Sequence, residues 1–336
     1  MRRLTAFLLV FVMLFALLCG CSAAPGRYDA SYMGCFDTAV ILSGYFKNKA
    51  DADAEFGRIF TDIEYLHRLF DIYHTYSGMN NIKTVNDSPG QWVKVDAPLV
   101  ELMAFSREVY GATAGRVDIA LGSVLSLWHD ARESEPPALP GAAALEAASA
   151  HTGPDAYAVD EAEGAVMLID PLARLDVGAV AKGFAAEYAA NNAMARGVSG
   201  VLINLGGNVR CIGEKPDGAW RVAVQDPDDE SGSIATAMIS GLSFVTSGDY
   251  QRYFMLDGVR YCHIIDPQTC YPAARYRSVS VICEDSAWAD ALSTALFLLN
   301  IEDGEALTGA HGAQALWVLP DGSLRMTDGM AAYISQ

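Results

Sequence analysis

Four stretches of this 336-residue sequence place glycine, aspartate and hydroxyl residues beside apolar runs. Glycine lets a backbone approach a ligand closely, carboxylate and hydroxyl oxygens bind hard cations such as Mg²⁺, and histidine transfers protons near neutral pH. Together these residue types suit the handling of an anionic substrate with a metal ion and a general base. The stretches are Gly115 to Asp118, Asp176 to Phe184, Thr246 to Tyr250 followed by Tyr261 to Thr269, and Ala289 to Ala295.

Each stretch also has a purely structural interpretation. The glycines between Asp176 and Phe184 predict an anion site at a helix N-terminus, or simply a tight turn from strand to helix. His263, just before Asp266-Pro267, is either a base at the rim of a site or a structural histidine. Asp290 and Thr294 share one helix face because they are four residues apart, so they either hold Mg²⁺ or only favour the helix dipole.

The remaining pattern predicts the elements that must position these stretches. Apolar residues spaced by three and four from Phe56 to Phe70 predict a long helix with one buried face, capped by Asp51. Further helices are predicted over Pro98 to Tyr110, Val180 to Ala195 and Ala287 to Leu299. The predicted strands are Phe36 to Tyr45, Ala165 to Ile169, Val201 to Leu205, Arg221 to Gln225, Ala235 to Ile239, Tyr261 to Ile265, Val279 to Cys283 and Ala315 to Leu319.

This mixture of strands and helices predicts an α+β fold, with mixed β-sheets and packed helices in a single large domain of two intimate lobes. The proline-rich segment Ser134 to Pro140 is interpreted as a surface excursion, because the stretches on either side look like parts of one site. The net charge of −18 argues against nucleic acid as a partner. The odd number of cysteines after residue 21 argues against a disulfide framework, leaving open a Cys262–Cys270 bridge or idle thiols.

The N-terminus has the pattern of an export signal. Met1-Arg2-Arg3 precedes an apolar run from Ala6 to Leu18, which is too short to span a bilayer as a helix. A small residue directly before Cys21 is typical of a bacterial lipoprotein, so residues 1–20 are expected to be a signal peptide and Cys21 to be lipidated. The alternative is ordinary cleavage near Ala23-Ala24. A tether over 21–32 and a catalytic domain over 33–336 are expected to follow.

In this order, the four stretches and several others resemble the FAD:protein FMN transferase family, often called ApbE. The matching segments are Met33-Gly34, Tyr73 to Asn86, Arg116 to Trp128, Asp176 to Phe184, Leu202 to Asn208, Val224 to Pro227, Thr246 to Tyr253, His263 to Thr269 and Asp290 to Phe297. The resemblance implies a Mg²⁺-dependent enzyme that cuts FAD and attaches FMN through a phosphoester to a Ser or Thr of another protein, with release of AMP.

The resemblance also implies roles for individual residues. Asp290 and Thr294 match metal ligands, as does the backbone of Ala179, and His263 matches the histidine proposed as the base. The implied FAD-binding residues are Met33, Tyr73, Arg116, Val117, Asp118, Asp176, Lys182 and Ile265.

Two positions depart from the family pattern. Some members carry a second aspartate ligand where this chain has Ser293, so the metal site would have one ligand fewer or use water instead. Cys270 stands where a glycine usually follows Thr269. The turn at Cys270 is therefore expected to differ if it needs the backbone angle of that glycine.

Three functions stay open at this stage. A protein hydroxyl as the acceptor makes the chain a transferase, and water as the acceptor makes it a Mg²⁺-dependent FAD pyrophosphatase that releases FMN and AMP. Without turnover the chain is a non-catalytic FAD-binding lipoprotein. The acceptors implied by the resemblance are flavoprotein subunits of membrane redox pumps and extracellular flavin reductases with an exposed Ser or Thr. The implied place is the extracytoplasmic face of the bacterial cell membrane, reached only through the lipid anchor.

Overall fold

The structure is built on one eight-stranded antiparallel sheet. The computed structural model describes residues 24–335. The strands follow the order β1-β2-β6-β7-β10-β15-β16-β17, and each is antiparallel to its neighbours. They are β1 (Gly26–Cys35), β2 (Thr38–Phe46), β6 (Val201–Leu205), β7 (Asn208–Ile212), β10 (Ser243–Gly248), β15 (Ser278–Cys283), β16 (Gln314–Val318) and β17 (Leu324–Met326).

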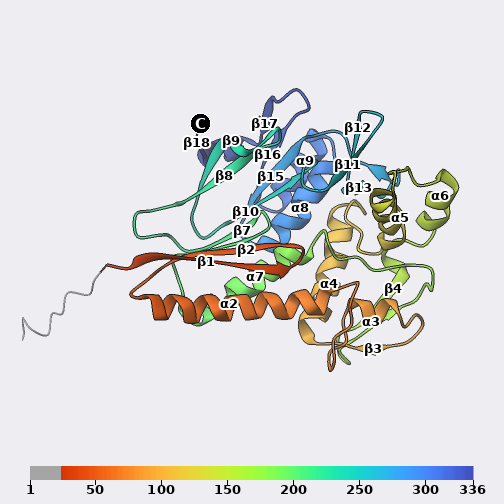
Figure 1. Cartoon of the computed structure of the whole chain (residues 1–336), viewed down its shortest axis with the longest axis horizontal. Coiled ribbons are helices and arrows are strands. Elements are labelled where there is room, and N and C mark those ends of the chain that lie inside the picture. The colour runs from red at the N-terminus through yellow and green to blue at the C-terminus, as the bar shows by residue number, and fades with distance from the viewer. Residues whose placement is uncertain (1–23, 336) are drawn as a thin grey trace, which may run out of the picture.

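Helices cover one face of this sheet (Figure 1). They are α2 (Lys49–Phe70), α7 (Ala181–Ala195), α8 (Ser286–Leu298) and α9 (Ile301–Ala310). As the spacing predicts, α2 buries one apolar face, which includes Phe56 and Ile63. Its N-cap is Asn48, whose side chain accepts the N–H of Asp51, so the prediction of Asp51 as the cap is wrong. Asp51 lies in the first turn, where its charge favours the helix dipole.

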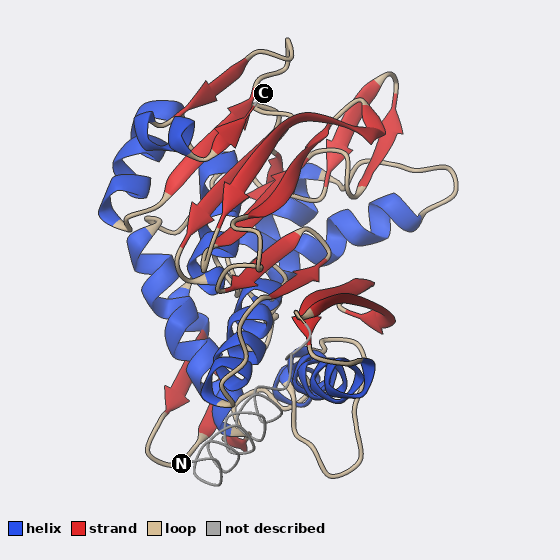
Figure 2. Cartoon of the chain, turned by 90° about the vertical axis from the view of Figure 1, so that its left-hand side faces the viewer, coloured by secondary structure: helices blue, strands red, loops and turns tan. Residues whose placement is uncertain are grey.

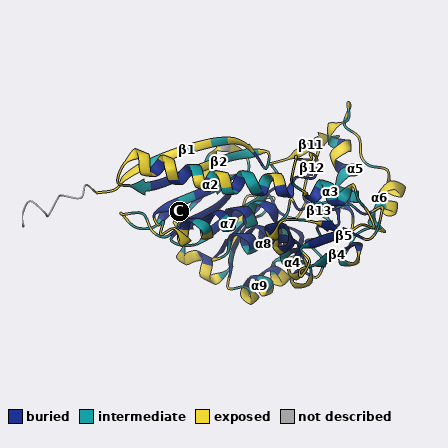
Figure 3. Ribbon diagram, turned by 90° about the horizontal axis from the view of Figure 1, so that it is seen from below, coloured by how far each residue is buried: buried dark blue, intermediate teal, exposed yellow. Residues whose placement is uncertain are grey.

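Small residues bring α7 and α8 into close contact. The buried positions of α7 are alanines and one glycine, and α8 is buried along most of its length (Figure 3). A Cβ on Gly183 would lie 2.3 Å from the carbonyl oxygen of Ser286 and 2.4 Å from Cβ of Asp290. Because no side chain fits there, the first turn of α7 lies directly against Asp290.

A smaller sheet covers the opposite face of the main sheet (Figure 2). It consists of β8 (Trp220–Asp226), β9 (Asp229–Ile239) and β18 (Ile334–Ser335). Successive residues of a strand point to opposite faces. On β10, Phe244 accordingly packs with Trp220 of the small sheet, whereas Val245 packs with the helices.

The elements between α2 and α7 form a second region beside the main sheet (Figure 1). Its buried residues, such as Leu102 and Val166, belong to the same core cluster as Val40 of β2, so the two regions share one core. The elements are α3 (Ile82–Asn86), β3 (Val93–Lys94), α4 (Ala97–Ala112), α5 (Gly122–Glu133), α6 (Ala142–Ser149), a 3₁₀ helix (Pro154–Ala156), β4 (Tyr157–Asp160) and β5 (Ala165–Leu168).

Short hairpins complete the chain. They are β11 (Tyr253–Leu256) with β12 (Val259–Cys262), and β13 (Ile265–Asp266) with β14 (Tyr271–Pro272); a 3₁₀ helix (Asp328–Ala332) precedes β18. The predicted strand from Tyr261 to Ile265 is therefore broken, which leaves His263 in a bend between β12 and β13. The α+β prediction is confirmed, but the helices α3, α5, α6 and α9 were not predicted.

The N-terminal prediction needs a correction within the described residues. Residues 26–32 were assigned to a tether, but they pair with β2 from Gly26 onward and form part of β1. The expected signal peptide and Cys21 lie outside the described residues. Within 24–335, no helix is both long and apolar enough to cross a membrane.

The cysteines of the described part are all free and buried. Cys262 and Cys270 do not form the bridge that the sequence left open. Segment 134–140 connects α5 to α6 at the surface, in line with a surface excursion inside one domain.

Candidate active site

A large cavity opens where the β1–β2 turn, the end of α2 and the segments before α7 and after β10 meet. Its volume is about 1870 Å³, whereas a small-molecule pocket typically has roughly 300–1,000 Å³. Each of the four stretches contributes lining residues, among them Arg116, Lys182, His263 and Asp290. The fold thus brings together side chains that are far apart in the sequence, in a space larger than one small ligand needs.

Asp290 lies on α8 at the inner wall of this cavity and is 3% exposed. Its Oδ2 accepts the N–H of Gly183 at 2.8 Å, and Nζ of Lys182 lies 3.8 Å from its Oδ1. Burial raises the pKa of Asp290, while Lys182, the Gly183 N–H and the amide of Asn208 act to lower it. The close contact between α7 and α8 therefore places a buried carboxylate beside the lysine of the glycine-rich turn.

The residues around Asp290 have the oxygen donors that a hard cation needs. Thr294 lies one turn later on α8, with Oγ1 3.4 Å from the carbonyl oxygen of Asp290, and both residues line the cavity with Ala179. Nearby, the buried Nδ2 of Asn208 has no hydrogen-bond partner within the described part of the chain. The Asn208 amide therefore lowers the pKa of Asp290 from nearby, without a well-formed hydrogen bond to the carboxylate. A buried, unsatisfied group beside these oxygens fits a site that binds a further ligand.

This donor set contains a single carboxylate. Among residues 24–335, no group of three or more His, Cys, Asp and Glu side chains could hold a metal ion. Mg²⁺ commonly uses one or two carboxylates and takes its other ligands from water and substrate phosphates. A carboxylate, a hydroxyl and a backbone carbonyl from Asp290, Thr294 and Ala179 therefore fit Mg²⁺ better than a metal that requires several protein ligands.

His263 is held by the backbone of Arg252. The carbonyl oxygen of Arg252 lies 3.0 Å from the backbone N of His263 and 3.2 Å from its Nδ1. Since a carbonyl only accepts hydrogen bonds, Nδ1 carries the proton and Nε2 is the basic nitrogen. Burial among the cavity walls, with the charges of Arg252 and Lys182, lowers the pKa of His263 to about 4. The ring is nevertheless exposed to the cavity, so a neutral base faces the space where a substrate would bind.

Two ion pairs connect segments around the cavity. Both oxygens of Asp266 lie within 3.0 Å of the Nη1 of Arg116, which ties the segment before α5 to β13. Across the mouth, Nη2 of Arg252 lies 3.6 Å from Oδ2 of Asp37 in the β1–β2 turn. The partly buried Arg116–Asp266 pair therefore holds the segment after His263, whereas the exposed Arg252–Asp37 pair contributes little.

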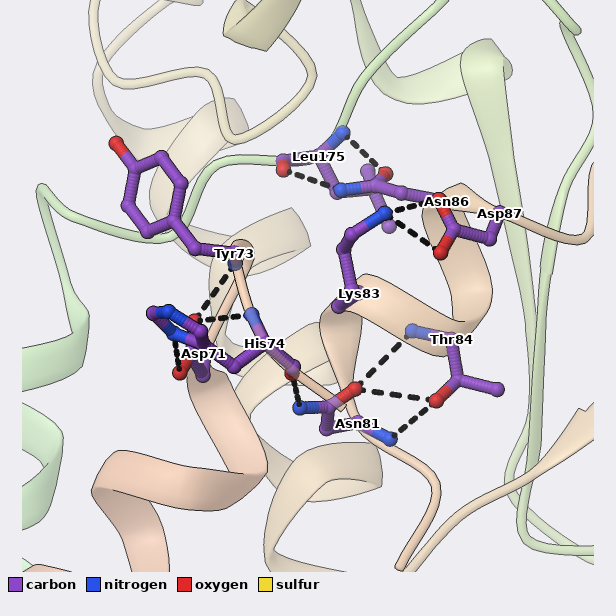
Figure 4. Close-up of polar contacts among 9 residues, drawn as sticks. All are labelled: Asp71, Tyr73, His74, Asn81, Lys83, Thr84, Asn86, Asp87 and Leu175. Atoms are coloured by element: carbon purple, nitrogen blue, oxygen red, sulfur yellow. Dashed lines mark hydrogen bonds and ion pairs between the residues drawn. The ribbon is translucent and has the colours of Figure 1, made fainter. Parts of the chain in front are cut away.

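Tyr73 stands at the cavity edge on a loop fixed by Asp71 (Figure 4). Oδ1 of Asp71 accepts the N–H groups of Tyr73 (2.6 Å) and His74 (3.1 Å), and its Oδ2 accepts the hydroxyl of Tyr76 (2.7 Å). Although burial opposes it, these donors lower the pKa of Asp71, so the carboxylate stays charged. The ring of Tyr73 remains 54% exposed beside His129, with 6.3 Å between ring centroids, and is available to a ligand.

The two remaining aspartates of the predicted site differ in what they bond. Asp118 accepts the N–H groups of Ala120 and Gly153, both at 2.8 Å, so its carboxylate mainly holds two loops. Among residues 24–335, the Asp176 carboxylate accepts only the N–H of Gly178, at 2.9 Å, through Oδ1. Burial raises the pKa of both aspartates. The carboxylate of Asp176 can thus accept more hydrogen bonds from a ligand than that of Asp118.

Most of the predicted site residues line this one cavity. They are Tyr73, Arg116, Val117, Asp118, Asp176, Ala179, Lys182, His263, Ile265, Asp290 and Thr294. Met33 is the exception, because it is 74% exposed and its neighbour Gly34 lines the cavity instead. Other lining residues lie inside the matching segments but had no role assigned to them, such as His74 and Arg252. A further group lies outside those segments, and no sequence signal indicated them: Asp37, His129, Arg132 and Arg174.

Comparisons with known proteins show the family of the chain. The sequence model of the ApbE family matches residues 36–317. An FAD:protein FMN transferase of Klebsiella pneumoniae (strain 342) is 32% identical over 295 residues, which cover 87% of this chain and 88% of that protein. Another, from Rhodobacter capsulatus, is 33% identical over 244 residues, covering 72% of this chain but only 46% of that protein.

The fold comparison leads to the same family. The crystal structure of the ApbE protein from Thermotoga maritima superimposes with a TM-score of 0.84 at 29% sequence identity. The superposition covers 93% of this chain and 100% of that one. Because the family model matches most of the sequence and the fold agrees along nearly the whole chain, this protein belongs to the ApbE family.

Proposed function

We propose that this protein is an FAD:protein FMN transferase that moves FMN from FAD to a Ser or Thr hydroxyl of an acceptor flavoprotein. The observation that carries the proposal is one cavity that joins a neutral histidine, a lysine, the buried carboxylate of Asp290 and the partly exposed hydroxyl of Thr294. A protein that only carried a flavin would need neither the base nor the hard oxygen donors. The names of the relatives support the same reaction.

The reaction assigns a separate task to each group. Nε2 of His263 takes the proton from the acceptor hydroxyl, whose oxygen forms a bond to the phosphorus of the FMN half. The bond from that phosphorus to the bridging oxygen breaks, and AMP leaves with the electron pair. Lys182 and Arg252 place positive charge in the same cavity, which favours the anionic pyrophosphate there.

We propose Mg²⁺ as the metal, held by Asp290, Thr294 and the carbonyl of Ala179. When bound, Mg²⁺ neutralises phosphate charge and stabilises the leaving phosphate of AMP. The chain holds these donors rigidly, because Asp290 is fixed by the Gly183 N–H and Thr294 belongs to the same helix.

The second candidate function uses the same site with water as the acceptor, giving FMN and AMP. The volume of the cavity, about 1870 Å³, favours this hydrolysis as a side reaction, because it leaves space for water when no acceptor is present. We further propose that the protein works on the extracytoplasmic side of the membrane, anchored through Cys21. Flavoprotein subunits of redox pumps and extracellular flavin reductases are the proposed acceptors.

The test is to incubate the purified protein with FAD and Mg²⁺, with and without an acceptor domain. AMP release and flavin fluorescence of the acceptor band in a denaturing gel are then measured. Equal amounts of AMP and labelled acceptor are expected. AMP with free FMN and no labelled band would favour the pyrophosphatase, and intact bound FAD would leave only a binding protein.

A matched pair of variants tests the metal assignment. Asp290→Asn should abolish the response to Mg²⁺, because it removes the only carboxylate of the proposed donor set. Asp285→Asn is the control, since Asp285 caps the same helix through the N–H groups of Ala287 and Trp288 and does not line the cavity. A full Mg²⁺ response in Asp290→Asn would show that the metal binds elsewhere.

A further inference from the structure

The side chain of Asn86 makes an unusual pair of hydrogen bonds at the back of the cavity wall. Its Nδ2 donates to the carbonyl oxygen of Leu175 at 2.9 Å, and its Oδ1 accepts the N–H of Leu175 at 2.8 Å (Figure 4). Leu175 is completely buried, and the residues on either side of it, Arg174 and Asp176, line the cavity. Asn86 does not line this cavity, so it acts on the wall from behind.

This pair of bonds imitates a strand neighbour. In an antiparallel ladder, two opposed residues exchange both N–H···O bonds. On its other side, the segment around Leu175 is held by backbone bonds from Gly122 to Arg174 (3.0 Å) and from Asp176 to Ile119 (2.7 Å). The amide of Asn86 thus supplies the second neighbour. The amide suits this role because it carries a donor and an acceptor on two separate atoms, whereas ionised aspartate cannot donate, alanine offers neither group, and a serine hydroxyl has a single oxygen.

Asn86 ends α3, and the other end of this helix is fixed to the loop of Tyr73 (Figure 4). Asn81 is fully buried and forms a capping box with Thr84. Its Nδ2 donates to the carbonyl of His74 at 2.8 Å, and the backbone N of Lys83 donates to the carbonyl of Asp71 at 3.0 Å. The helix α3 is therefore bonded to both cavity walls, one at each end.

The two walls also influence each other electrostatically. Burial raises the pKa of Tyr73, and the charge of Asp176 is the next largest cause. The phenol and this carboxylate, which line the same cavity, are therefore within electrostatic reach of each other.

We propose that Asn86 is a positioning residue that, through α3, holds the Asp176 wall in register with the Tyr73 wall, so that the substrate meets both at once. This inference rests on the proposed function in one respect only, namely that FAD is the molecule bound between the walls. Asn86 acts through Leu175 and touches no reacting atom. Its loss should therefore weaken binding of FAD more than it slows the chemical step.

The experiment compares Asn86→Ala, Asn86→Asp and Asn86→Gln with the unaltered protein. The Kd for FAD is measured by flavin fluorescence in buffer with EDTA, so that the measurement does not depend on turnover. KM for FAD, KM for the acceptor and kcat are then measured with Mg²⁺. The control is Asn80→Ala, since Asn80 lies in the same loop and makes one bond, of 2.8 Å, to the carbonyl of Lys94.

Asn86→Ala and Asn86→Asp should raise both the Kd and the KM for FAD about tenfold, which corresponds to about 1.4 kcal/mol. The KM for the acceptor and kcat should stay within about twofold. Asn86→Gln, which keeps both groups of the amide, should recover part of the loss, and Asn80→Ala should match the unaltered protein. An unchanged Kd for FAD in Asn86→Ala would overturn the inference. A lower kcat with an unchanged KM for FAD would also overturn the inference, because that result would mean only that fewer molecules are folded. If the unaltered protein binds FAD but transfers nothing, the proposed function fails while the Kd comparison still tests Asn86.

Discussion

The protonation state of His263 gives the sharpest prediction. Burial and the charges of Arg252 and Lys182 lower the pKa of His263 to about 4, from its usual value of about 6.5. The active form of a base is the unprotonated one, so activity should be present above this pKa and should be lost as the pH falls through it. Because the ring is exposed to the cavity, water screens part of this effect, and the midpoint is expected between about 4 and 6.5. The rate should therefore be flat from pH 7 to 8.

The assay is the pH dependence of AMP release with a saturating acceptor. His263→Ala should lower kcat by about 10²–10⁴-fold and should also remove the acidic limb. The control is His151→Asn, because His151 pairs with Asp170 at 2.7 Å outside the cavity and should leave the limb in place. If His263→Ala kept the same acidic limb, another group would be the base and the reasoning would be refuted.

Three further predictions concern the packing that supports the site. Gly183→Ala should abolish Mg²⁺-dependent transfer and lower Tm, because the added Cβ would lie 2.4 Å from Cβ of Asp290. Normal activity with an unchanged Tm would contradict the close packing of α7 on α8. Arg210→Ala should lower the free energy of unfolding, measured with denaturant, by about 3–5 kcal/mol. The reason is that Glu187, which is partly buried and lies 2.8 Å from Nε of Arg210, would lose its ion-pair partner. A decrease of less than about 1 kcal/mol would contradict this reasoning. Cys270→Gly should keep activity and change the free energy of unfolding by less than about 1 kcal/mol. Glycine relieves the strain of the positive φ of 59°, which offsets the buried surface lost with the side chain. A large decrease in the free energy of unfolding would show that the buried thiol stabilises the fold.

Local pattern predicted those parts of the fold that depend on local physics. The spacing of Phe56, Ile59 and Ile63 predicts α2, since a helix turn sets which side chains face the core. The capping residue was missed because Asn48 and Asp51 are both favourable near a helix start, and only the bond between them separates their roles. The site stretches were found because glycine and aspartate cluster there, although their meeting in one cavity depends on tertiary packing.

Long-range contacts explain what the sequence could not predict. Asn86 and Leu175 are 89 positions apart, and Arg116 and Asp266 are 150 apart, so nothing in the local sequence of one indicates the other. The question raised by Cys270 has a structural answer. It adopts φ +59°, the left-handed conformation that glycine takes easily, so the turn keeps this angle without glycine.

Ser293 does not add a ligand to the proposed metal site. Its hydroxyl is fully buried, donates to the carbonyl of Asp290 at 2.9 Å and lies 2.8 Å from Oγ of Ser247, so it joins α8 to β10 and does not line the cavity. A donor set with one carboxylate leaves most of the charge of a divalent cation to be balanced by substrate phosphates.

Metal and FAD should therefore strengthen each other's binding by the same factor, since coupling between two sites is reciprocal. Titration of FAD by fluorescence into Asn208→Ala, and into the unaltered protein, at several Mg²⁺ concentrations would measure this coupling. If the buried amide of Asn208 belongs to the same site, the variant should bind FAD with a smaller response to Mg²⁺. A Kd for FAD independent of Mg²⁺ in the unaltered protein would show that the cation is held by the chain alone, contrary to a site with a single carboxylate.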